Sequence, residues 1–436
     1  MNFHLRPGGV LRGECRVAGD KSISHRAIML GSIATGVTRI HGFLEAEDAI
    51  STLNAFRAMG VEISRPGHGE VEIQGKGLYG LKAPASPLDL GNSGTSMRLL
   101  CGLLAGQEFD SVLIGDPSLS RRPMQRVTGP LALMGGRIET GNQGTAPLYI
   151  HGGQHLKGIE YELPVASAQV KSCLLLAGLY ADGTTCITEP AVTRDHTERM
   201  LHAFSYPVRK QGNRVCLSGG DHLIGTEIDV PADSSSAAFF MVGASIAPGS
   251  EVLLRHVGIN PTRIGIVHIL NLMGADIGLE HEREAGGEPV ADIRVKSAAL
   301  KGIRIPEELV PLAIDEFPVL FIAASCAEGE TILSGARELR VKESDRIQGM
   351  LDGLLELGVD AVATDDGMVI RGGDLRGGAI DSRGDHRIAM AFSIAALRAR
   401  KEIVIRNCAN VNTSFPGFVE MARTLGLKIS REEFPQ

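Results

Sequence analysis

One pattern of apolar and polar positions recurs along this 436-residue chain. It consists of the apolar end of an expected helix, a Met-Gly or Leu-Gly pair, and a short strand-like run. A glycine at that place closes a helix in the left-handed conformation, which glycine adopts without steric cost. Five copies have their glycine at the following positions: Gly60, Gly135, Gly274, Gly358 and Gly426. A sixth, degenerate copy runs from Leu201 to Val208 and has Ser205 at the corresponding position.

The spacing of the copies predicts the domain organisation. Neighbouring copies are 68 to 84 residues apart, which is longer than the repeats of solenoid proteins. The pattern therefore predicts six α/β units, three before about residue 233 and three after it, and hence two pseudo-equivalent lobes. The alternative is an ordinary α/β enzyme in which a helix, a glycine and a strand often follow one another.

Composition and charge narrow the class of protein. Hydrophobic residues make up 43% and charged residues 22%, as in soluble globular proteins. The net charge of -7, the 4% of aromatic residues and the absence of Trp argue against nucleic acid or an anionic membrane as a partner. No apolar run is long enough to span a membrane, and the first residues lack the apolar segment of a signal peptide. We therefore expect a cytoplasmic protein.

The cysteines and histidines do not predict a metal site. The seven cysteines are scattered and none forms a CxxC pair, so we expect reduced thiols. His151 and His155 are four residues apart, but the surrounding sequence is rich in glycine and does not predict a helix. We expect no metal ion.

The stretch from Gly19 to Ala27 leads from a strand-like run into an expected helix. Lys21, Ser22 and Arg26 fall on the connecting turn and the first turn of that helix. Backbone N–H groups at a helix start lack helical partners and the helix dipole is positive there, so anions are favoured. These side chains could bind a phosphate or a carboxylate. The alternative is a capped helix with solvated charges.

A second group of possible anion contacts lies between residues 91 and 123. Gly91 to Gly94 forms a turn of small residues before an apolar helix, and glycine lets the backbone approach a ligand closely. Pro123 suits the first turn of a helix, so we expect Arg122 at a helix N-cap, where it could hold a carboxylate or phosphate bidentately. The alternatives are an ordinary capped loop and a solvated arginine.

Ser167 and Gln169 stand before another apolar run. Ser167 is an expected N-cap, and Gln169 belongs to the first turn of the helix that follows. Both side chains could instead donate hydrogen bonds to, or accept them from, a polyol. Capping alone is the alternative.

Asp315 ends an apolar run and precedes an apolar helix. A carboxylate in that place could act as a general base or only as an N-cap. Lys342, Glu343 and Arg346 follow with helical spacing, so we expect them to share one helix face. The alternative is a solvated helix with surface salt bridges.

His386 and Arg387 follow Asp385, which is an expected N-cap. A cation at a helix N-terminus opposes the dipole and costs a few tenths of a kcal/mol unless an anion is bound. This arrangement therefore favours an anion-binding role.

Taken together, the motifs resemble those of bacterial 5-enolpyruvylshikimate-3-phosphate synthases, in order and in spacing. The matching segments are Gly19–Arg26, Gly91–Thr95, Arg122-Pro123, Ser167–Gln169, Lys342–Arg346 and Asp385–Arg387. The segment Arg194–Glu198 is more similar to the class II branch than to the enterobacterial one. The resemblance runs from end to end, and the ordered set is specific although each motif alone is weak.

The resemblance implies an α/β (α+β) architecture, the two-lobed enolpyruvyl transferase fold. Each lobe would contain three βαβαββ repeats around a pseudo-threefold axis, six in all, with the active site in the interlobe cleft. This agrees with the six copies found in the sequence. The chain would cross between lobes near Gly19-Asp20 and near Pro231–Asp233. One lobe would then be residues 20–232, and the other residues 1–19 with 233–436.

The implied reaction transfers the enolpyruvyl group of phosphoenolpyruvate to the 5-hydroxyl of 3-phosphoshikimate and releases phosphate. It is a step of the shikimate pathway to chorismate and the aromatic amino acids. In the family it proceeds through a tetrahedral intermediate with C–O cleavage, without cofactor or metal, because arginines and lysines neutralise the substrates' anionic groups. We expect the two small-molecule substrates as partners of a monomer.

The resemblance also assigns roles to residues. The expected 3-phosphoshikimate contacts are Lys21, Ser22, Arg26, Ser167, Ala168, Gln169, Arg194, Asp315 and Lys342. The expected phosphoenolpyruvate contacts are Lys21, Gly94, Arg122, Gln169, Arg346 and Arg387. Asp315 would accept the proton of the 5-hydroxyl, assisted by Lys342, and Glu343 would protonate the methylene carbon, with Lys21 as the remaining catalytic residue. Family members insensitive to glyphosate have Ala at the position of Gly94, so we expect glyphosate to inhibit this protein.

One position departs from the enterobacterial pattern. Those members have a lysine that helps to bind phosphoenolpyruvate before a Thr-Phe-Pro segment near the C-terminus. Here Thr413 takes its place, before Ser414-Phe415-Pro416. The substitution is usual in class II, and the contact is left unassigned.

Two other functions are compatible with such a scaffold. A carboxyvinyltransferase acting on UDP-N-acetylglucosamine would have Lys-Asn at the first motif and a catalytic Cys on a mobile loop. This chain has Lys21-Ser22 and, in the loop, Arg121-Arg122 without Cys. A non-catalytic anion-binding protein is the other alternative, and the presence of both Asp315 and Glu343 argues against it.

Overall fold

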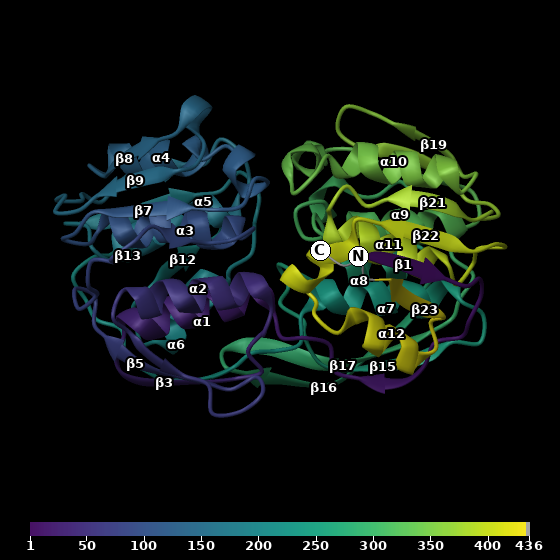
Figure 1. Cartoon of the computed structure of the whole chain (residues 1–436), viewed down its shortest axis with the longest axis horizontal. Helices are drawn as coiled ribbons and strands as arrows, with labels where there is room; N and C mark the ends of the chain where they lie inside the picture. The colour runs from purple at the N-terminus through teal and green to yellow at the C-terminus, as the bar shows by residue number, and fades with distance from the viewer. Residues whose placement is uncertain (433–436) are drawn as a thin grey trace. The chain divides into compact units, whose positions relative to one another are not determined.

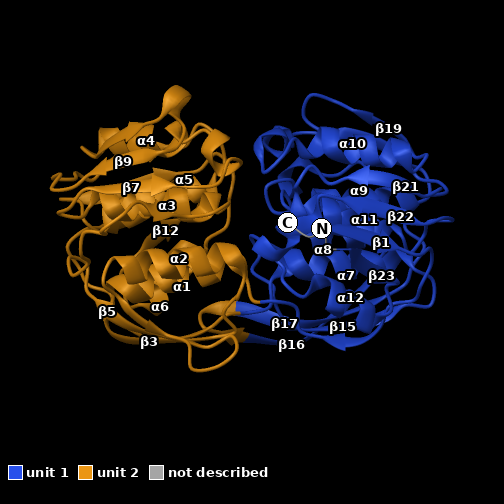
Figure 2. Ribbon diagram, viewed as in Figure 1, with its two compact units in different colours: residues 1–18, 231–283, 289–436 blue, residues 19–230, 284–288 orange. Residues whose placement is uncertain are grey.

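The computed structural model describes residues 1–432. The chain forms two compact units, which are coloured separately in Figure 2. Unit 1 comprises Met1–Ala18, Pro231–Arg283 and the chain from Pro289 onward, and unit 2 comprises Gly19–Val230 with Glu284–Glu288. The short segment Glu284–Glu288 was not singled out by the sequence pattern.

Unit 2 contains three four-stranded sheets and six α-helices, and the helices are labelled in Figure 1. Its helices are α1 (Lys21–Ile33), α2 (Glu47–Ala58), α3 (Gly94–Ala105), α4 (Gln125–Leu133), α5 (Ala168–Gly178) and α6 (His196–Ala203). The first sheet has the order β14 (Glu227–Asp229), β3 (Thr35–His41), β5 (Val71–Lys76), β4 (Glu62–Ser64). The second has β6 (Leu88–Asp89), β7 (Ser111–Ile114), β9 (Leu148–His151), β8 (Arg137–Thr140), and the third β10 (Glu160–Glu162), β11 (Thr184–Thr188), β13 (Arg214–Ser218), β12 (Arg209–Gln211).

Unit 1 repeats this plan. Its helices are α7 (Ser234–Ile246), α8 (Gly265–Leu272), α9 (Phe317–Cys326), α10 (Arg346–Glu356), α11 (His386–Ala395) and α12 (Phe418–Leu425). Its sheets have the orders β16 (Asp276–Ala285), β17 (Glu288–Lys296), β15 (Glu251–Gly258), β2 (Arg12–Cys15); β18 (Glu330–Leu333), β20 (Met368–Arg371), β19 (Asp360–Ala363); and β21 (Gly378–Asp381), β22 (Ile403–Arg406), β1 (Asn2–Leu5), β23 (Ile429–Glu432).

The six sheets share one pairing pattern. In five of them a parallel pair is followed by two antiparallel pairs, as in β14–β3, β3–β5 and β5–β4. In the sixth, β18–β20–β19, the parallel neighbour is reduced to an isolated bridge between Arg304 and Ile332. The prediction of six α/β units, three in each lobe, is confirmed.

The prediction that each repeat has a helix ended by a residue in the left-handed conformation is also confirmed. Positive φ angles occur at all five predicted glycines, from +80° at Gly358 to +116° at Gly426, each between a helix end and a strand. In the degenerate copy the same place, between α6 and β12, is taken by Ser205 with a φ of 63°. A residue with a Cβ atom adopts this conformation at a cost, so the backbone of the repeat is preserved where its glycine is not.

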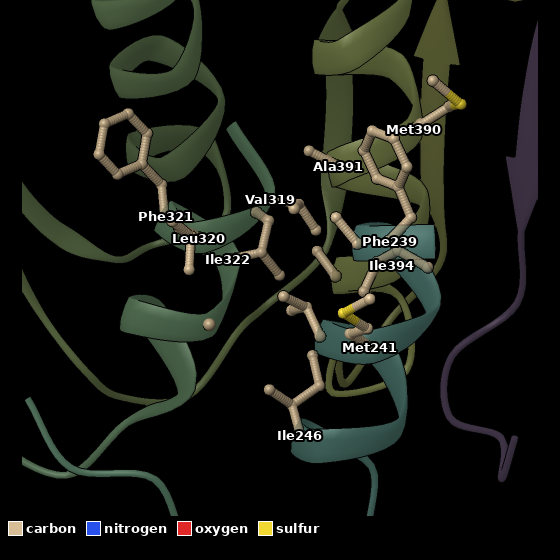
Figure 3. Close-up of a cluster of buried hydrophobic side chains, with 14 of the residues drawn as sticks. Phe239, Met241, Ile246, Val319, Leu320, Phe321, Ile322, Met390, Ala391 and Ile394 are labelled. Carbon is tan, nitrogen blue, oxygen red and sulfur yellow. The ribbon is translucent and has the colours of Figure 1, made fainter. Parts of the chain in front are cut away.

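The first helix of each repeat is central and the second is peripheral. All residues of α7 are buried, and it packs against α9 and α11 in the core of unit 1. Figure 3 shows part of this core, with Phe239 of α7, Val319 of α9 and Ile394 of α11. The peripheral α12 instead buries one stripe, which lies on a single face of the helix: Phe418, Val419, Ala422 and Leu425. The candidate site residues lie toward the N-terminal ends of these central helices and in the loops before them.

The expectation of reduced thiols was wrong for one pair of cysteines. Cys186 on β11 and Cys216 on β13 are direct partners in the antiparallel ladder and form a disulfide, with Cα atoms 4.1 Å apart. Opposite residues on paired strands bring their side chains together although 30 residues separate them in sequence. The other five cysteines are free thiols.

Candidate functional site

In unit 2 the first candidate motif opens α1. Asp20 is the N-cap, and its Oδ1 accepts a hydrogen bond of 2.9 Å from the backbone N–H of Ile23. Lys21 and Ser22 are the first two helical residues, as the sequence predicted. The Lys21 ammonium forms an ion pair with Asp48, a buried carboxylate on α2 that sequence reasoning missed. The first turn of α1 therefore presents a lysine that one carboxylate already orients.

Arg26 lies one turn further along α1 and is almost fully buried. Its Nε donates to Thr197 Oγ1 at 2.7 Å, its Nη2 to Ser172 Oγ at 2.8 Å, and its Nη1 to the carbonyl oxygen of Ser22 at 3.0 Å. Burial lowers the pKa of Arg26 to about 10; Arg194 also lowers it, and Glu198 raises it. Two guanidinium groups close enough to affect each other's protonation create a field that favours an anion.

The buried imidazole of His25 connects α1 to α2 and α3. Its Nδ1 lies 2.8 Å from Thr52 Oγ1 on α2 and 3.3 Å from Ser96 Oγ on α3. Burial lowers the pKa of His25 well below its ordinary value, and the charges of Lys21 and Arg26 lower it further. His25 is therefore neutral at physiological pH and holds α1, α2 and α3 together beside the candidate site.

The Gly91–Gly94 turn opens α3 as predicted, and Gly94 is the first helical residue. A Cβ atom added at Gly94 would lie 2.9 Å from Nη1 of Arg122 and 3.3 Å from Nη1 of Arg98. Arg122 also donates from Nη2 to Asn92 Oδ1 at 2.7 Å. The absent side chain thus leaves room for two guanidinium groups at a helix N-terminus. Arg98, one helical turn after Gly94, was missed by the sequence analysis.

Arg122 does not cap a helix, contrary to expectation. It follows the short 3-10 helix Leu119–Arg121 in extended backbone, and α4 begins three residues later at Gln125. The sequence analysis placed Pro123 in the first turn of a helix, but Pro123 lies two residues before α4 begins. The side chain is nevertheless buried beside Gly94.

The start of α5 carries the third group of unit 2. Ser167 is the N-cap, and its Oγ accepts a bond of 3.4 Å from the backbone N–H of Val170. Gln169 bridges to α3: its Oε1 accepts from Arg98 Nη1 at 2.5 Å and its Nε2 donates to Thr95 Oγ1 at 3.1 Å. The capping role predicted for Ser167 is confirmed, and Gln169 is held in place by the helix that carries Gly94.

In unit 1 a single buried guanidinium organises the carboxylates. Arg346 donates from Nη1 to Asp315 Oδ1 at 3.2 Å, from Nη2 to Glu343 Oε2 at 2.6 Å, and from Nε to Asp385 Oδ2 at 2.9 Å. Burial opposes its charge, but Asp385, Glu343 and Asp315 outweigh burial and raise the pKa of Arg346 above its ordinary value. Arg346 therefore stays charged and fixes three carboxylates around itself.

Lys342 and Glu343 do not lie on a helix with Arg346. They follow the 3-10 helix Arg337–Val341, and α10 begins only at Arg346 with Asp345 as its N-cap. The expectation of one helix face was wrong because Asp345 caps the helix by accepting from Gln348 N at 2.9 Å. The three side chains still gather near Asp315, whose Oδ1 is 3.6 Å from Lys342 Nζ.

Arg387 completes the group in unit 1. Asp385 caps α11 as predicted, accepting from the Arg387 backbone N–H at 2.9 Å. The Arg387 side chain donates from Nη1 to the carbonyl oxygen of Asp315 at 2.8 Å and lies 3.7 Å from Glu316 Oε1. Glu316 in turn accepts from Ser235 Oγ, which connects this group to the start of α7.

Most candidates in each unit lie at or within a few residues of a helix start, and Arg122 lies beside the start of α3. Unit 2 holds Lys21, Ser22, Arg26, Gly94, Arg122, Ser167, Ala168, Gln169 and Arg194, and unit 1 holds Asp315, Lys342, Glu343, Arg346 and Arg387. Thr413 is buried at the end of the 3-10 helix Cys408–Thr413 and donates to Asn410 O at 2.7 Å. Among residues 1–432, no group of three or more histidines, cysteines or carboxylates is placed to hold a metal ion, and no helix is long and apolar enough to cross a membrane.

Comparison with known proteins gives a consistent result. The sequence matches the family described as EPSP synthase (3-phosphoshikimate 1-carboxyvinyltransferase) over residues 5–421. The 3-phosphoshikimate 1-carboxyvinyltransferase of Methylococcus capsulatus is 70% identical, with 98% of each chain covered. That of Alkalilimnicola ehrlichii is 69% identical, with 99% of this chain and 97% of the relative covered.

Solved structures agree. EPSP synthase from Acinetobacter baumannii has a TM-score of 0.89 at 59% identity, covering 98% of this chain and 99% of that one. The enolpyruvyl transferase NikO from Streptomyces tendae has a TM-score of 0.81 at 16% identity and covers 100% of this chain and 99% of that one, a likeness of fold alone.

Proposed function

The chain belongs to the EPSP synthase (3-phosphoshikimate 1-carboxyvinyltransferase) family, and from this premise we propose that it transfers the enolpyruvyl group of phosphoenolpyruvate to 3-phosphoshikimate. The products are 5-enolpyruvylshikimate 3-phosphate and phosphate, in the shikimate pathway to the aromatic amino acids. The observation that carries the proposal is the match of nearly the whole chain to this family, with the motif residues gathered at helix starts. UDP-N-acetylglucosamine as acceptor is not favoured by any relative named above.

The proposed reaction is an addition followed by an elimination. The 5-hydroxyl oxygen bonds to C2 of phosphoenolpyruvate while its proton goes to a base, and a proton adds to the methylene carbon. The C2–O bond to phosphate then breaks, and a proton leaves the methyl group to restore the double bond. Both substrates are anionic throughout, so fixed cations are needed to bring them together.

The acceptor is assigned to unit 2. Lys21, Ser22 and Arg26 would bind the phosphate and neighbouring oxygens of 3-phosphoshikimate, with Arg194 as a further cation. Support comes from the helix start at Lys21 and from the closeness of Arg194 to Arg26. Ser167, Ala168 and Gln169, at the start of α5, would contact its hydroxyl and carboxylate groups.

Phosphoenolpyruvate is assigned to the cations beside Gly94 and to those beside Asp315. Arg122, together with Lys21 and Gln169, would bind it from unit 2. Arg346 and Arg387 would bind it from unit 1. Glyphosate, which carries a phosphonate and a carboxylate, would compete for the same cations.

We assign Asp315 as the base and Glu343 as the acid that protonates the methylene carbon. Support for Asp315 is its contact with two cations, Arg346 and Lys342, which favour the ionised form that a base requires. Lys342 would also assist at the 5-hydroxyl. Acid–base assistance of this kind contributes on the order of 10²- to 10⁴-fold, and orienting two bound substrates contributes about 7–11 kcal/mol.

We propose that the chain forms two lobes, residues 20–232 and residues 1–19 with 233–436, and that both contribute residues to the one reaction. We also propose a cytoplasmic monomer without a nucleic-acid or membrane partner, in keeping with the net charge of -7. Sedimentation of the purified protein at assay concentration tests the monomer, and a dimer would contradict it.

The function is tested by mixing the purified protein with phosphoenolpyruvate and 3-phosphoshikimate and measuring released phosphate. We expect release that depends on both substrates, and no release when UDP-N-acetylglucosamine replaces 3-phosphoshikimate. Absence of release with 3-phosphoshikimate would contradict the proposal.

A further inference from the structure

Lys171 is a buried cation that has no role in the reaction proposed above. It lies in α5, two residues after Gln169, and its side chain is 0% exposed. Its Nζ lies 2.9 Å from Glu189 Oε2 and 2.7 Å from Glu198 Oε1, and both carboxylates are buried. A lysine is almost never found fully buried without such partners, since an unpaired charge inside a protein is very costly. The group therefore holds two negative charges against one positive charge.

The ion pair between Lys171 and Glu198 lies beside a second link between the same two helices. Ser172, the next residue of α5, accepts from Thr197 Oγ1 at 2.7 Å, and Thr197 directly precedes Glu198 in α6. The two adjacent links fix the register of α5 against the first turn of α6. Both helices are labelled in Figure 1.

The guanidinium of Arg26 donates hydrogen bonds to both hydroxyl groups of the second link. Its Nε donates to Thr197 Oγ1 at 2.7 Å and its Nη2 to Ser172 Oγ at 2.8 Å. Both hydroxyls belong to residues adjacent in sequence to the ion pair. A shift of α6 along α5 would move the two acceptors apart and turn the guanidinium.

The charge of Glu198 also acts on Arg26 directly. Burial has the largest effect on the pKa of Arg26 and lowers it. Among the neighbouring charges, Glu198 raises this pKa the most. Glu198 thus attracts both Lys171 and Arg26. Without the charge of Lys171, Glu198 would attract Arg26 more strongly and would compete with any anion that Arg26 binds.

We propose that Lys171 is a positioning residue for the phosphate of the acceptor: it neutralises Glu198 and fixes α5 against α6, so that Arg26 stays oriented toward the phosphate ester. This inference rests on the proposed function. Lys171 itself does not touch the substrate, because its side chain has no exposed surface. It acts through Arg26 and through the start of α6, which Arg194 precedes by two residues.

The test is the binding of 3-phosphoshikimate to the full-length protein, measured by calorimetry without phosphoenolpyruvate, together with the two KM values. Lys171→Met should weaken 3-phosphoshikimate binding at least 10-fold and raise its KM similarly, with the KM of phosphoenolpyruvate changed less than 3-fold. Lys171→Arg, which keeps the charge, should stay within 3-fold of wild type. The double variant Lys171→Met/Glu198→Gln should recover most of the lost affinity, since the competing carboxylate is gone.

A matched control separates positioning from stability. Gln107 is buried in the same unit and donates from Nε2 to Leu78 O at 3.1 Å, away from the α5–α6 links. Gln107→Met should lower Tm without changing either KM. If Lys171→Met lowers Tm and leaves 3-phosphoshikimate binding within 2-fold, or weakens both substrates equally, the inference is wrong.

Two outcomes need separate readings. If Lys171→Met does not fold, Lys171→Gln replaces it, because the amide can donate to both carboxylates while removing the charge; the same loss of affinity is expected, and unchanged affinity overturns the inference. If the wild-type protein does not bind 3-phosphoshikimate at all, both the proposed function and the inference about Lys171 are wrong. Binding by wild type and variants alike defeats the inference alone.

Discussion

Asp315 is the residue whose surroundings say most about its chemistry. It lies in a turn two residues before the start of α9, with Arg346 Nη1 at 3.2 Å and Lys342 Nζ at 3.6 Å from the same Oδ1. These two cations contact the carboxylate and fix its direction. The carbonyl oxygen of Asp315 also accepts from Arg387, so the proposed base is in direct contact with a proposed phosphoenolpyruvate contact.

Replacing this carboxylate should separate catalysis from binding. For Asp315→Ala we expect kcat to fall on the order of 10²- to 10⁴-fold, with the Kd of 3-phosphoshikimate changed far less. Steady-state kinetics and calorimetry measure the two effects. Asp352→Ala, which removes an exposed carboxylate paired with Arg383 in the same unit, is the control and should leave both values unchanged. Undiminished turnover in Asp315→Ala would remove Asp315 as the base.

The close packing of Arg122 against Gly94 leads to a second prediction about a single residue. An added Cβ would approach Arg122 Nη1 to 2.9 Å, which forces the guanidinium to move. For Gly94→Ala we expect the KM of phosphoenolpyruvate to rise on the order of 10-fold, about 1.4 kcal/mol, and inhibition by glyphosate to weaken by more than that. A dose–response curve in the phosphate assay measures both effects.

Gly129 provides the matched control for that substitution. It lies within α4, and a Cβ there would meet nothing within 4 Å. Gly129→Ala should leave the KM and the glyphosate response unchanged. A wild-type protein that resists glyphosate, or a Gly94→Ala variant that remains equally sensitive, would refute the assignment of Gly94.

At the scale of elements, the end of α6 is the one place where the repeat lacks its glycine. Ser205 is exposed and has a φ of 63°, whereas the other five copies have glycine in that conformation. For Ser205→Gly we expect the free energy of unfolding to rise by about 0.5–1 kcal/mol, because relief of the left-handed strain exceeds the added entropy of the unfolded chain. Denaturant unfolding measures the change.

The reverse substitution in an intact copy should have the opposite sign. Gly274 has a φ of +90°, and a Cβ there meets no atom closer than 3.7 Å, so strain is the main effect. Gly274→Ala should lower the free energy of unfolding by about 1 kcal/mol. Changes of the same sign in Ser205→Gly and Gly274→Ala would contradict the equivalence of the two helix ends.

The β15–β17 pair contains a bulge stabilised by one carboxylate. The register shifts between Leu254 and Val257, and Asp292 accepts from the backbone N–H of His256 and from Arg255 Nη1, both at 2.8 Å. Burial alone would raise the pKa of Asp292, but these hydrogen bonds outweigh it and lower the pKa from 3.8 to about 2. The ionised form is therefore the one that the fold stabilises.

This lowered pKa predicts how stability depends on pH. Because the folded pKa lies below the unfolded one, the contribution of Asp292 is complete above about pH 4 and is lost as the pH falls toward 2. Asp292→Asn should cost about 1.5–3 kcal/mol at pH 7, and the gap to wild type should narrow below pH 4. Unfolding curves at pH 7 and pH 3 measure it, with the exposed Asp360→Asn as control. A gap that does not narrow would contradict the cause given for the shift.

Sequence patterns predicted features that depend on neighbouring residues. The helix-ending glycines and the caps Ser167 and Asp385 could be predicted because each is a matter of one turn of backbone. Arg122 and Lys342 were misplaced because a 3-10 turn, which lacks a sequence signature, stands before each helix.

Features that depend on distant residues were missed. Arg98, His25 and Lys171 acquire their roles only when other helices pack against them, and the Cys186–Cys216 disulfide requires the register of two strands. Arg98 had one usable signal, its place one helical turn after Gly94. Lys171 had another, a charge in an otherwise apolar helix.

At the scale of the whole molecule, two units of one plan divide the assigned chemistry. Unit 2 carries the proposed cations on α1 and beside the start of α3, and unit 1 carries Asp315 and Glu343 around Arg346. The resemblance inferred from the ordered motifs is confirmed by the family match and by relatives of 58–70% identity. The proposed reaction of this chain breaks the C–O bond of phosphoenolpyruvate rather than its P–O bond.

That claim is tested directly with phosphoenolpyruvate carrying ¹⁸O in the bridging C2–O–P position. The purified protein is incubated with this compound and 3-phosphoshikimate, and both products are analysed by mass spectrometry. With C–O cleavage, the released phosphate should contain the ¹⁸O and the enol ether product should not. Unlabelled phosphate, label in the organic product, or no phosphate at all would contradict it.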